Sequence, residues 1–215
     1  SSYAKTKEKY QDNIVYSLQD KTSWYFNFNV NRKAYNHTAK TSDQQKKSTQ
    51  TAILNKNFRQ ALNFAIDRTT YSAQSNGEEA ASKTLRNTLV PPTFVQVGDK
   101  SFGEVVSSKL VQYGTEWSGI NLADAQDGYF NKEKAKAKFA EAKKELETQG
   151  VTFPIHLDVP VDQTNKNAVS GMNSLKQTLE TVLGSDNVVV DVQQLSTDDF
   201  GNVAFLAPNT AARDY

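Results

Sequence analysis

The 215-residue chain contains no cysteine, one methionine and two histidines. The absence of cysteine excludes a disulfide scaffold, a thiolate metal site and a cysteine nucleophile. An excess of either charge is also lacking, because 25 lysines and arginines face 24 aspartates and glutamates, for a net charge of +1. This balance gives no reason to expect a nucleic-acid or anionic-membrane surface.

Long apolar runs are absent as well, and none approaches the ~20 residues that a membrane span needs. The first residues do not show a basic segment followed by an apolar stretch, so we expect no signal peptide, either because one was removed or because the sequence is a piece of something longer. Apolar residues make up only 37% of the chain and the mean hydropathy is −0.65. Because aromatic residues reach 10%, a folded protein is still expected, with one large domain as the simplest organisation.

Alternation of apolar and polar residues predicts two strands in the first 30 residues, over 14–18 and 24–30. The second strand places Trp24, Phe26, Phe28 and Val30 on one face, which indicates a core on that side. Between the strands, Gln19-Asp20-Lys21 is typical of a turn. The polar stretch 31–52 has no sustained period and is predicted to be a surface loop.

Apolar residues at helical spacing predict a strong helix over 58–66 and a shorter one over 78–88 that ends before Pro91. Further along the chain the pattern predicts alternating helices and strands: helices over 102–112, 132–149 and 168–183, strands over 153–159 and 188–192, and a last short helix beginning at Ser196. The alternation from Lys132 onward favours an α/β fold with a mixed sheet, flanking helices and at least one crossover between parallel strands.

Residue pairs that could carry chemistry each have a simpler structural interpretation. His156 and Asp158 could share a metal, but no third ligand is evident nearby, so a solvated pair is the favoured interpretation. Asp198-Asp199 fits a helix cap, and Asp67-Arg68 fits an exposed helix face. Motifs for nucleophilic, metal-dependent or nucleotide chemistry do not occur, which argues against an enzyme.

Aromatic residues form two groups. Trp24, Phe26 and Phe28 are interpreted mainly as core, with Tyr25 on the polar face. The second group lies in an irregular, glycine-containing stretch, where aromatic side chains often serve recognition of a peptide or sugar; it comprises Tyr113, Trp117, Tyr129 and Phe130.

Residues 57–71, with the sequence NFRQALNFAIDRTTY, resemble the R-x-A-[LI]-x-x-A-[IL]-D-R segment of extracellular solute-binding proteins that deliver oligopeptides to ABC importers. Other segments match that family in the same order. They are the Phe-Asn stretch at 26–29, the loop Val90-Pro91-Pro92, and Tyr129-Phe130-Asn131 followed by Lys134-Ala135-Lys136. The sequence, rich in asparagine, glutamine and lysine, is similar to those of the oligopeptide-binding lipoproteins of low-GC Gram-positive bacteria.

The resemblance implies one lobe of a two-lobed, periplasmic-binding-protein-like clamp that closes over a peptide. Residues 1–215 would be a single lobe, most of the C-terminal lobe of a longer protein. The implied partners are oligopeptides and the membrane permease of an ABC importer. The implied protein is an extracellular monomer held to the membrane by a lipid on its N-terminal part, without cofactor, metal, nucleic-acid partner or catalytic step.

The resemblance also suggests peptide-binding residues at Trp24, Tyr25, Asn165 and Arg213. One departure limits this inference, because the family's Gly-Trp motif, which precedes an aspartate that binds the peptide's amine, does not occur before Tyr215. The chain is therefore expected to carry only part of the pocket. Two alternatives remain: a lobe that binds another solute, such as a nickel chelate, a sugar or a pheromone, or a secreted hydrolase.

Overall fold

A computed structural model describes residues 2–17, 22–207 and 213–215. The chain divides into two compact units. The first unit comprises Ser1–Tyr25 and Asp67–Phe130, and the second comprises Phe26–Ile66 and Asn131–Tyr215.

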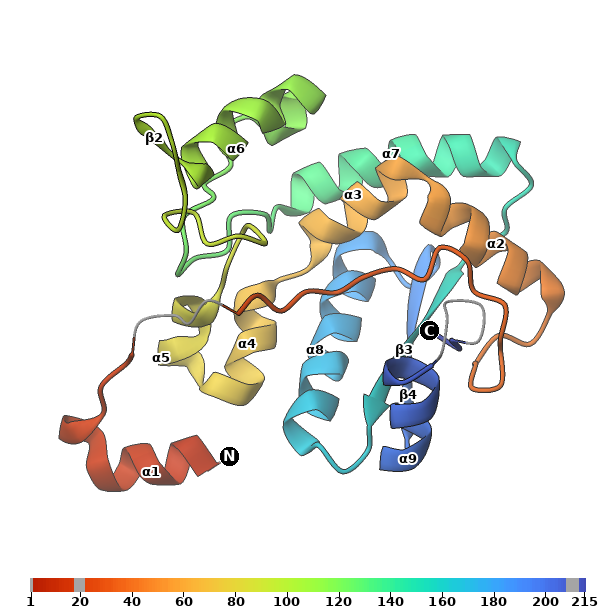
Figure 1. Cartoon of the computed structure of the whole chain (residues 1–215). Helices are drawn as coiled ribbons and strands as arrows, with labels where there is room; N and C mark the ends of the chain where they lie inside the picture. The colour runs from red at the N-terminus through yellow and green to blue at the C-terminus, as the bar shows by residue number, and fades with distance from the viewer. Residues whose placement is uncertain (1, 18–21, 208–212) are drawn as a thin grey trace. The chain divides into compact units, whose positions relative to one another are not determined.

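The second unit is a β-α-β arrangement covered by further helices (Figure 1). Strands β3 (Ile155–Asp162) and β4 (Val188–Leu195) pair in parallel, in a register that runs from Ile155↔Val188 to Asp162↔Leu195. Helix α8 (Lys166–Leu183) connects the two strands. The remaining helices of this unit are α2 (Asp43–Leu54), α3 (Lys56–Ala65), α7 (Lys132–Thr148), α9 (Thr197–Phe200) and a π-helical turn at Gly201–Phe205.

The core of the second unit forms where the apolar stripes of α3 and α7 meet each other and α8, which packs on the sheet. Phe58, Leu146 and Val190 are fully buried, and the rings of Phe58 and Phe139 lie 6.3 Å apart. The α7 stripe that the sequence predicts, Ala135, Phe139, Ala142 and Leu146, is buried throughout. Burial of such side chains stabilises the unit by about 1.5–3 kcal/mol each for the larger ones.

Helix ends in this unit follow the residues that predicted them. Asn131 accepts a hydrogen bond from the backbone N–H of Lys134 at the start of α7, and Gly150 follows the helix with a φ of +73°. Gly184 ends α8 with a φ of +88°, a conformation that favours glycine.

A side-chain pair on α8 also contacts the outer backbone of β4. Lys176 donates a hydrogen bond to the carbonyl of Val190 (2.8 Å), and Glu180 accepts one from the Val190 N–H (2.9 Å). Lys176 and Glu180 in turn form an ion pair of 2.6 Å, four residues apart on the helix. The pair therefore ties the middle of the strand to the helix that precedes it.

The first unit is mainly helical. It contains α1 (Ser2–Tyr10), α4 (Arg68–Asn76), α5 (Glu78–Ala81) and α6 (Phe102–Leu110), with 3₁₀ turns at Gln11–Asn13, Ser82–Thr84, Val111–Tyr113 and Thr115–Trp117. Two short antiparallel strands, β1 (Gln96–Val97) and β2 (Lys100–Ser101), complete it.

The predicted α/β class is confirmed, with one parallel and one antiparallel strand pair, and the predicted helices over 58–66, 102–112, 132–149 and 168–183 are found with small shifts at their ends. Strands β3 and β4 extend three residues beyond the predicted 153–159 and 188–192. The helix predicted over 78–88 ends earlier, because α5 gives way to a 3₁₀ turn at Ser82. The assignment of 1–215 to a single lobe stays a prediction.

The predictions for residues 14–52 are wrong in three places. Residues 14–17 and 22–29 form no strand, and Phe26, Phe28 and Val30 are exposed, because the structure gives this stretch no neighbouring strand among the described residues. The turn predicted at 19–21 lies outside the described residues. The loop predicted over 31–52 contains α2, which buries Ser48, Thr49 and Ala52, small residues that a hydropathy pattern does not mark as core.

The sequence interpretation of Asp67-Arg68 as an exposed helix face is also wrong. The chain leaves helical geometry at Ile66, and Asp67 caps the next helix by accepting the Thr70 N–H. Arg68 forms an ion pair of 2.5 Å with Asp127 and thereby holds the loop before α7.

In the part of the chain that the structure covers, no helix combines the length and the apolar character required to cross a bilayer.

Candidate functional site

The candidate site begins with segment 26–31 of the second unit, which is extended over 26–29 and turns at Val30 and Asn31 (Figure 1). Phe26, Phe28 and Val30 are 49%, 39% and 57% exposed. Among the described residues, the backbone groups of Asn27, Phe28 and Val30 have no hydrogen-bond partner. An extended segment with open backbone groups is able to pair with another extended chain.

A small pocket of about 110 Å³ lies against this segment. Residues 27–31 form one wall, and Arg213 and Tyr215 form the other. The Nε atom of Arg213 is buried and has no hydrogen-bond partner within the described ranges 2–17, 22–207 and 213–215. A buried, unsatisfied guanidinium N–H is costly, so a ligand that brings an acceptor oxygen into this pocket would be favoured.

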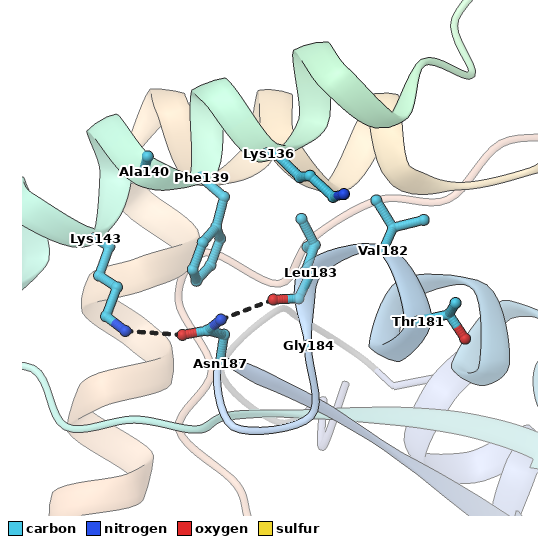
Figure 2. Close-up of a pocket in the computed structure, with 9 residues that line it drawn as sticks. All are labelled: Lys136, Phe139, Ala140, Lys143, Thr181, Val182, Leu183, Gly184 and Asn187. Carbon is cyan, nitrogen blue, oxygen red and sulfur yellow. Dashed lines mark hydrogen bonds between the residues drawn. The ribbon is translucent and has the colours of Figure 1, made fainter.

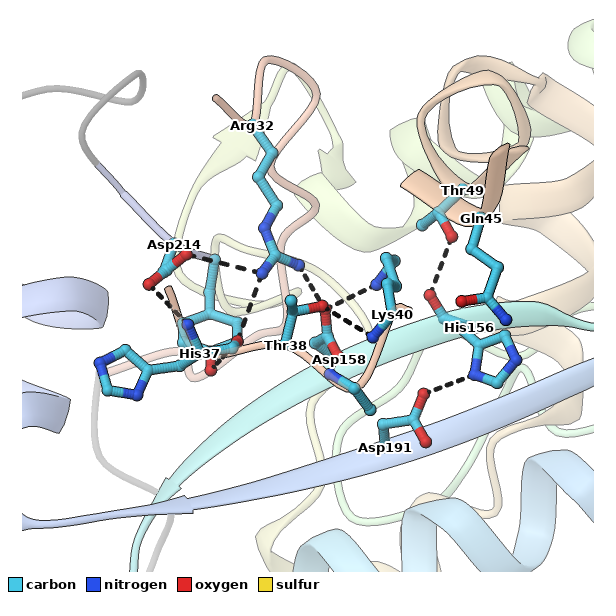
Figure 3. A network of polar contacts seen from close by, with 12 residues as sticks. Arg32, His37, Thr38, Lys40, Gln45, Thr49, His156, Asp158, Asp191 and Asp214 are labelled. Carbon is cyan, nitrogen blue, oxygen red and sulfur yellow. Dashed lines mark hydrogen bonds and ion pairs between the residues drawn. The ribbon is translucent and has the colours of Figure 1, made fainter. Parts of the chain in front are cut away.

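The residues that follow segment 26–31 and the end of the chain join a buried network of charged side chains (Figure 3). Arg32 and Lys40 converge on Asp158 of β3, and each places a nitrogen 2.6 Å from its Oδ2 atom. The Thr38 hydroxyl and the Ala39 N–H also donate to this carboxylate, at 2.7 and 3.0 Å. The side chains of Asp158 and Lys40 are 0% and 1% exposed, so the loop that carries residues 32–40 is held to the sheet by buried charge.

The same network fixes the last described residues of the chain. Asp214 is fully buried and accepts hydrogen bonds from the backbone N–H groups of Asn36 (2.8 Å) and His37 (3.1 Å). The Tyr215 hydroxyl donates to the His37 carbonyl at 2.5 Å. These contacts hold residues 214 and 215 against the loop and leave Arg213 beside segment 27–31.

The guanidinium of Arg32 joins the two halves of the network. Its central carbon lies 4.2 Å from the ring centroid of Tyr35 and 5.1 Å from that of Tyr215, within the range of cation–π attraction. It also lies 3.7 Å from Asp214, measured from Nη2 to Oδ1. Arg32 therefore contacts both the strand carboxylate Asp158 and the C-terminal segment.

Burial and charge compete in the pKa values of this network. Burial raises the pKa of Asp158, but the Lys40 charge and the hydrogen bonds from Lys40, Ala39 and Thr38 outweigh it, so the pKa lies below its usual 3.8. Burial lowers the pKa of Lys40, against the opposing effect of Asp158. Burial also raises the pKa of Tyr215, with Asp158 and Asp214 adding to the shift.

His156 and Asp158 do not form the solvated pair that the sequence favoured. In β3 the two side chains have different partners, and His156 places Nδ1 2.8 Å from Asp191 of β4. Asp158 is buried, so the prediction of a solvated pair is wrong for this carboxylate. Over the described ranges, no three histidine, aspartate or glutamate side chains gather as a metal site would require.

A second, more open pocket of about 430 Å³ lies between α7 and the end of α8 (Figure 2). Phe139, Val182 and Leu183 give it an apolar floor, and each is less than 10% exposed. Lys143 donates to the side chain of Asn187 (2.9 Å), which in turn donates to the Leu183 carbonyl (2.7 Å). These bonds fix the turn that leads into β4.

The four residues suggested for peptide binding have different surroundings. Trp24 and Tyr25 belong to the first unit and are 89% and 70% exposed, so the expected burial of Trp24 is wrong. Asn165 caps α8 by accepting the Ala168 N–H at 3.1 Å. Arg213 lines the smaller pocket. The peptide-binding role of all four stays a prediction.

Sequence reasoning did not find the residues that hold this site together, namely Arg32, Lys40, Asp158, Asp214 and Tyr215. One signal was available for Asp158, a charged residue between Leu157 and Val159 in a strand that is otherwise apolar. The other four lie in stretches without any period, and only the folded chain brings them to one place.

The aromatic residues of the irregular stretch 113–130 differ in exposure. Tyr113 is 70% exposed. Trp117 and Tyr129 pack edge to face with centroids 6.2 Å apart, and the Tyr129 hydroxyl donates to the Asn87 carbonyl at 2.8 Å. Trp117 and Tyr129 therefore help to hold this loop in place, whereas Tyr113 remains open to a ligand.

Comparison with known proteins gives a consistent family. Residues 1–211 match the family described as bacterial extracellular solute-binding proteins, family 5 Middle. The chain is 62% identical over all 215 residues to the oligopeptide-binding protein AliB of Streptococcus pneumoniae serotype 4, and 55% identical to the oligopeptide-binding protein SarA of Streptococcus gordonii. It is 53% identical to the oligopeptide-binding protein AmiA of Streptococcus pneumoniae serotype 4. The chain spans about a third of the length of these relatives, since it covers 33%, 32% and 33% of them.

Proposed function

The chain belongs to family 5 of the bacterial extracellular solute-binding proteins, and from this premise we propose that it is the peptide-binding part of an oligopeptide-capture protein of an ABC importer. The relatives that match its whole length are named as oligopeptide-binding proteins. The proposed substrate class is therefore short extracellular peptides.

The observation that carries the proposal is the buried, unpartnered Nε of Arg213 beside segment 26–31. A peptide in extended conformation presents alternating N–H and C=O groups, which match the open backbone of Asn27, Phe28 and Val30. Its carboxylate, or one of its carbonyl oxygens, would satisfy Arg213. Backbone pairing of this kind gives affinity that depends little on the peptide's side chains.

Capture in this proposal is passive and needs no cofactor and no catalytic group. Hydrated space around the side chains would tolerate many sequences, because a bridging water costs little and accepts varied partners. Closure of two lobes over the peptide would then signal the permease. The chain would be part of the C-terminal lobe of a monomeric, extracellular protein held to the membrane by a lipid on its N-terminal part.

The experiment that tests substrate class starts from the full-length polypeptide that contains this chain, purified from its host without refolding. Native mass spectrometry should show bound masses that fragment as peptides. If only metal-chelate, sugar or other solute masses appeared, the peptide assignment would be wrong. Release of cleaved peptides or glycans during incubation with substrate libraries would instead establish an enzyme.

The experiment that tests the pocket is Arg213→Gln in the same polypeptide. A hydrogen bond to a charged group contributes about 1.5–3 kcal/mol, so affinity for a random hexapeptide library should fall about 10- to 100-fold. Libraries with free and with amidated C-termini distinguish the peptide carboxylate from a chain carbonyl as the partner. The exposed Lys144→Gln on α7 is the matched control, because it removes one positive charge away from the pocket. An unchanged affinity of the Arg213 variant would contradict the proposed site.

A further inference from the structure

The carboxylate of Asp214 makes its hydrogen bonds inside the protein, away from any ligand. This carboxylate is fully buried and already bonds the backbone N–H groups of Asn36 and His37. It therefore has no exposed surface to offer a peptide. We propose that Asp214 is a positioning residue, which fixes the backbone next to Arg213 and so fixes where the Arg213 guanidinium stands in the pocket. This inference rests on the proposed function, since it presumes that Arg213 binds the ligand.

The contrast among the last three residues supports this role. Asp214 and Tyr215 are hydrogen-bonded to residues 36 and 37, whereas Arg213 forms neither a hydrogen bond nor an ion pair in the part of the chain that the structure describes. A long side chain without bonds of its own loses considerable rotamer freedom when a ligand fixes it. Anchoring the adjacent backbone beforehand reduces the part of that loss that falls on binding.

The network offers a matched control in Asp158. Both carboxylates are fully buried and both lie beside Arg32. The other partners of Asp158 are Thr38, Ala39 and Lys40, and none of them contacts the 213–215 segment through a hydrogen bond that the structure records. Replacement of Asp158 should therefore loosen the same network at the sheet, and it reaches the 213–215 segment only indirectly, through Arg32.

The test is a double-mutant cycle in the full-length polypeptide, with the random hexapeptide library as the probe. Asp214→Asn alone should lower affinity about tenfold. In the Arg213→Gln background it should lower affinity less than about twofold, because the residue through which it acts is gone. Asp158→Asn should give the same fold-change in both backgrounds. A merely structural role of Asp214 would give equal losses as well.

Each outcome decides something different. Equal losses from Asp214→Asn in both backgrounds would overturn the positioning role and leave the proposed function intact. No loss from Arg213→Gln alone would overturn the positioning role and the proposed pocket, while bound peptide masses would still test the substrate class separately. If Asp214→Asn does not fold, Tyr215→Phe serves instead, since it removes only the hydroxyl bond to His37 and keeps the ring in the pocket wall. That variant should lower affinity about threefold in the parent, and an undiminished loss in the Arg213→Gln background would contradict the inference.

Discussion

Two neighbouring stretches of the second unit invert the usual distribution of polar and apolar side chains. In residues 26–30 the apolar side chains lie outside, with Val30 57% exposed. In residues 31–40 two charged side chains, Arg32 and Lys40, lie inside at 8% and 6% exposed, whereas Lys33 between them is exposed. The first stretch leaves backbone and rings open, and the second supplies the buried bonds that hold the pocket wall. Here a side chain is buried where hydrogen-bond and ion-pair partners surround it, and its hydropathy decides less.

The largest effect is expected from removing the carboxylate of Asp158, which neutralises the buried charges of Arg32 and Lys40. Asp158→Ala leaves Arg32 and Lys40 buried without their shared partner, so the free energy of unfolding should fall by about 3–5 kcal/mol. Chemical denaturation measures this loss. Asp43→Ala is the control, because Asp43 is 97% exposed in its pair with Lys46 and its removal should leave the free energy of unfolding nearly unchanged. Similar losses for the two variants would contradict the structural role of burial.

The contribution of Asp158 to stability should also be visible at low pH, and the variant Asp158→Asn tests it with a side chain of nearly the same shape. The folded pKa of Asp158 lies below its unfolded value of 3.8, so its contribution to stability is present above pH 3.8 and is lost as the pH falls through the folded value. Asp158→Asn should flatten this acid limb in denaturation curves recorded from pH 5 to pH 2. An acid limb as steep as that of the parent would place the titrating group elsewhere.

Tyr215 gives a smaller effect at the opposite end of the pH scale. Its folded pKa lies above the unfolded value of 10.0, so stability that is fully present below pH 10 should decline as the pH rises further, because only the unfolded phenol ionises readily. Tyr215→Phe should remove this alkaline decline and cost about 0.5–1.5 kcal/mol at neutral pH, for the lost bond to the His37 carbonyl. An unchanged alkaline decline would contradict the assignment.

The smallest effect is expected in the exposed stretch. Phe28→Ser should lower the free energy of unfolding by about 0.5–1 kcal/mol, because 39% of the residue's surface stays exposed in the folded chain. Phe58→Ser in α3 is the matched control, and the loss of its fully buried ring should cost about 3–5 kcal/mol. A large loss at Phe28 would show that the segment is part of the folded core.

Prediction from the sequence succeeded where a periodic pattern agreed with burial. The apolar pattern predicts α3, α7, β3 and β4, because the apolar residues of these elements meet each other within one compact unit. It failed over 14–52, since alternation alone does not supply the neighbouring strand that a β-strand needs, and the small buried residues of α2 carry no apolar signal.

For the candidate site, sequence reasoning proposed a binding role for one residue that lines the pocket and for none of the residues that hold the pocket in place. Arg213 was suggested only by the resemblance to a family. Asp214 lies 178 residues from Asn36, its hydrogen-bonding partner, so no local pattern connects them. Buried polar networks are in general specified by the fold that closes around them, and a single sequence shows their members as isolated charges.

The bonds that Lys176 and Glu180 make with Val190 have a consequence for assembly. A strand at the rim of a sheet is a template on which another chain can stack, and proteins often guard it. Here one ion pair occupies both the N–H and the C=O of a central residue of β4. Any strand added at that edge would first have to displace two charged side chains from their hydrogen bonds, which protects this edge of β4 against uncontrolled self-association.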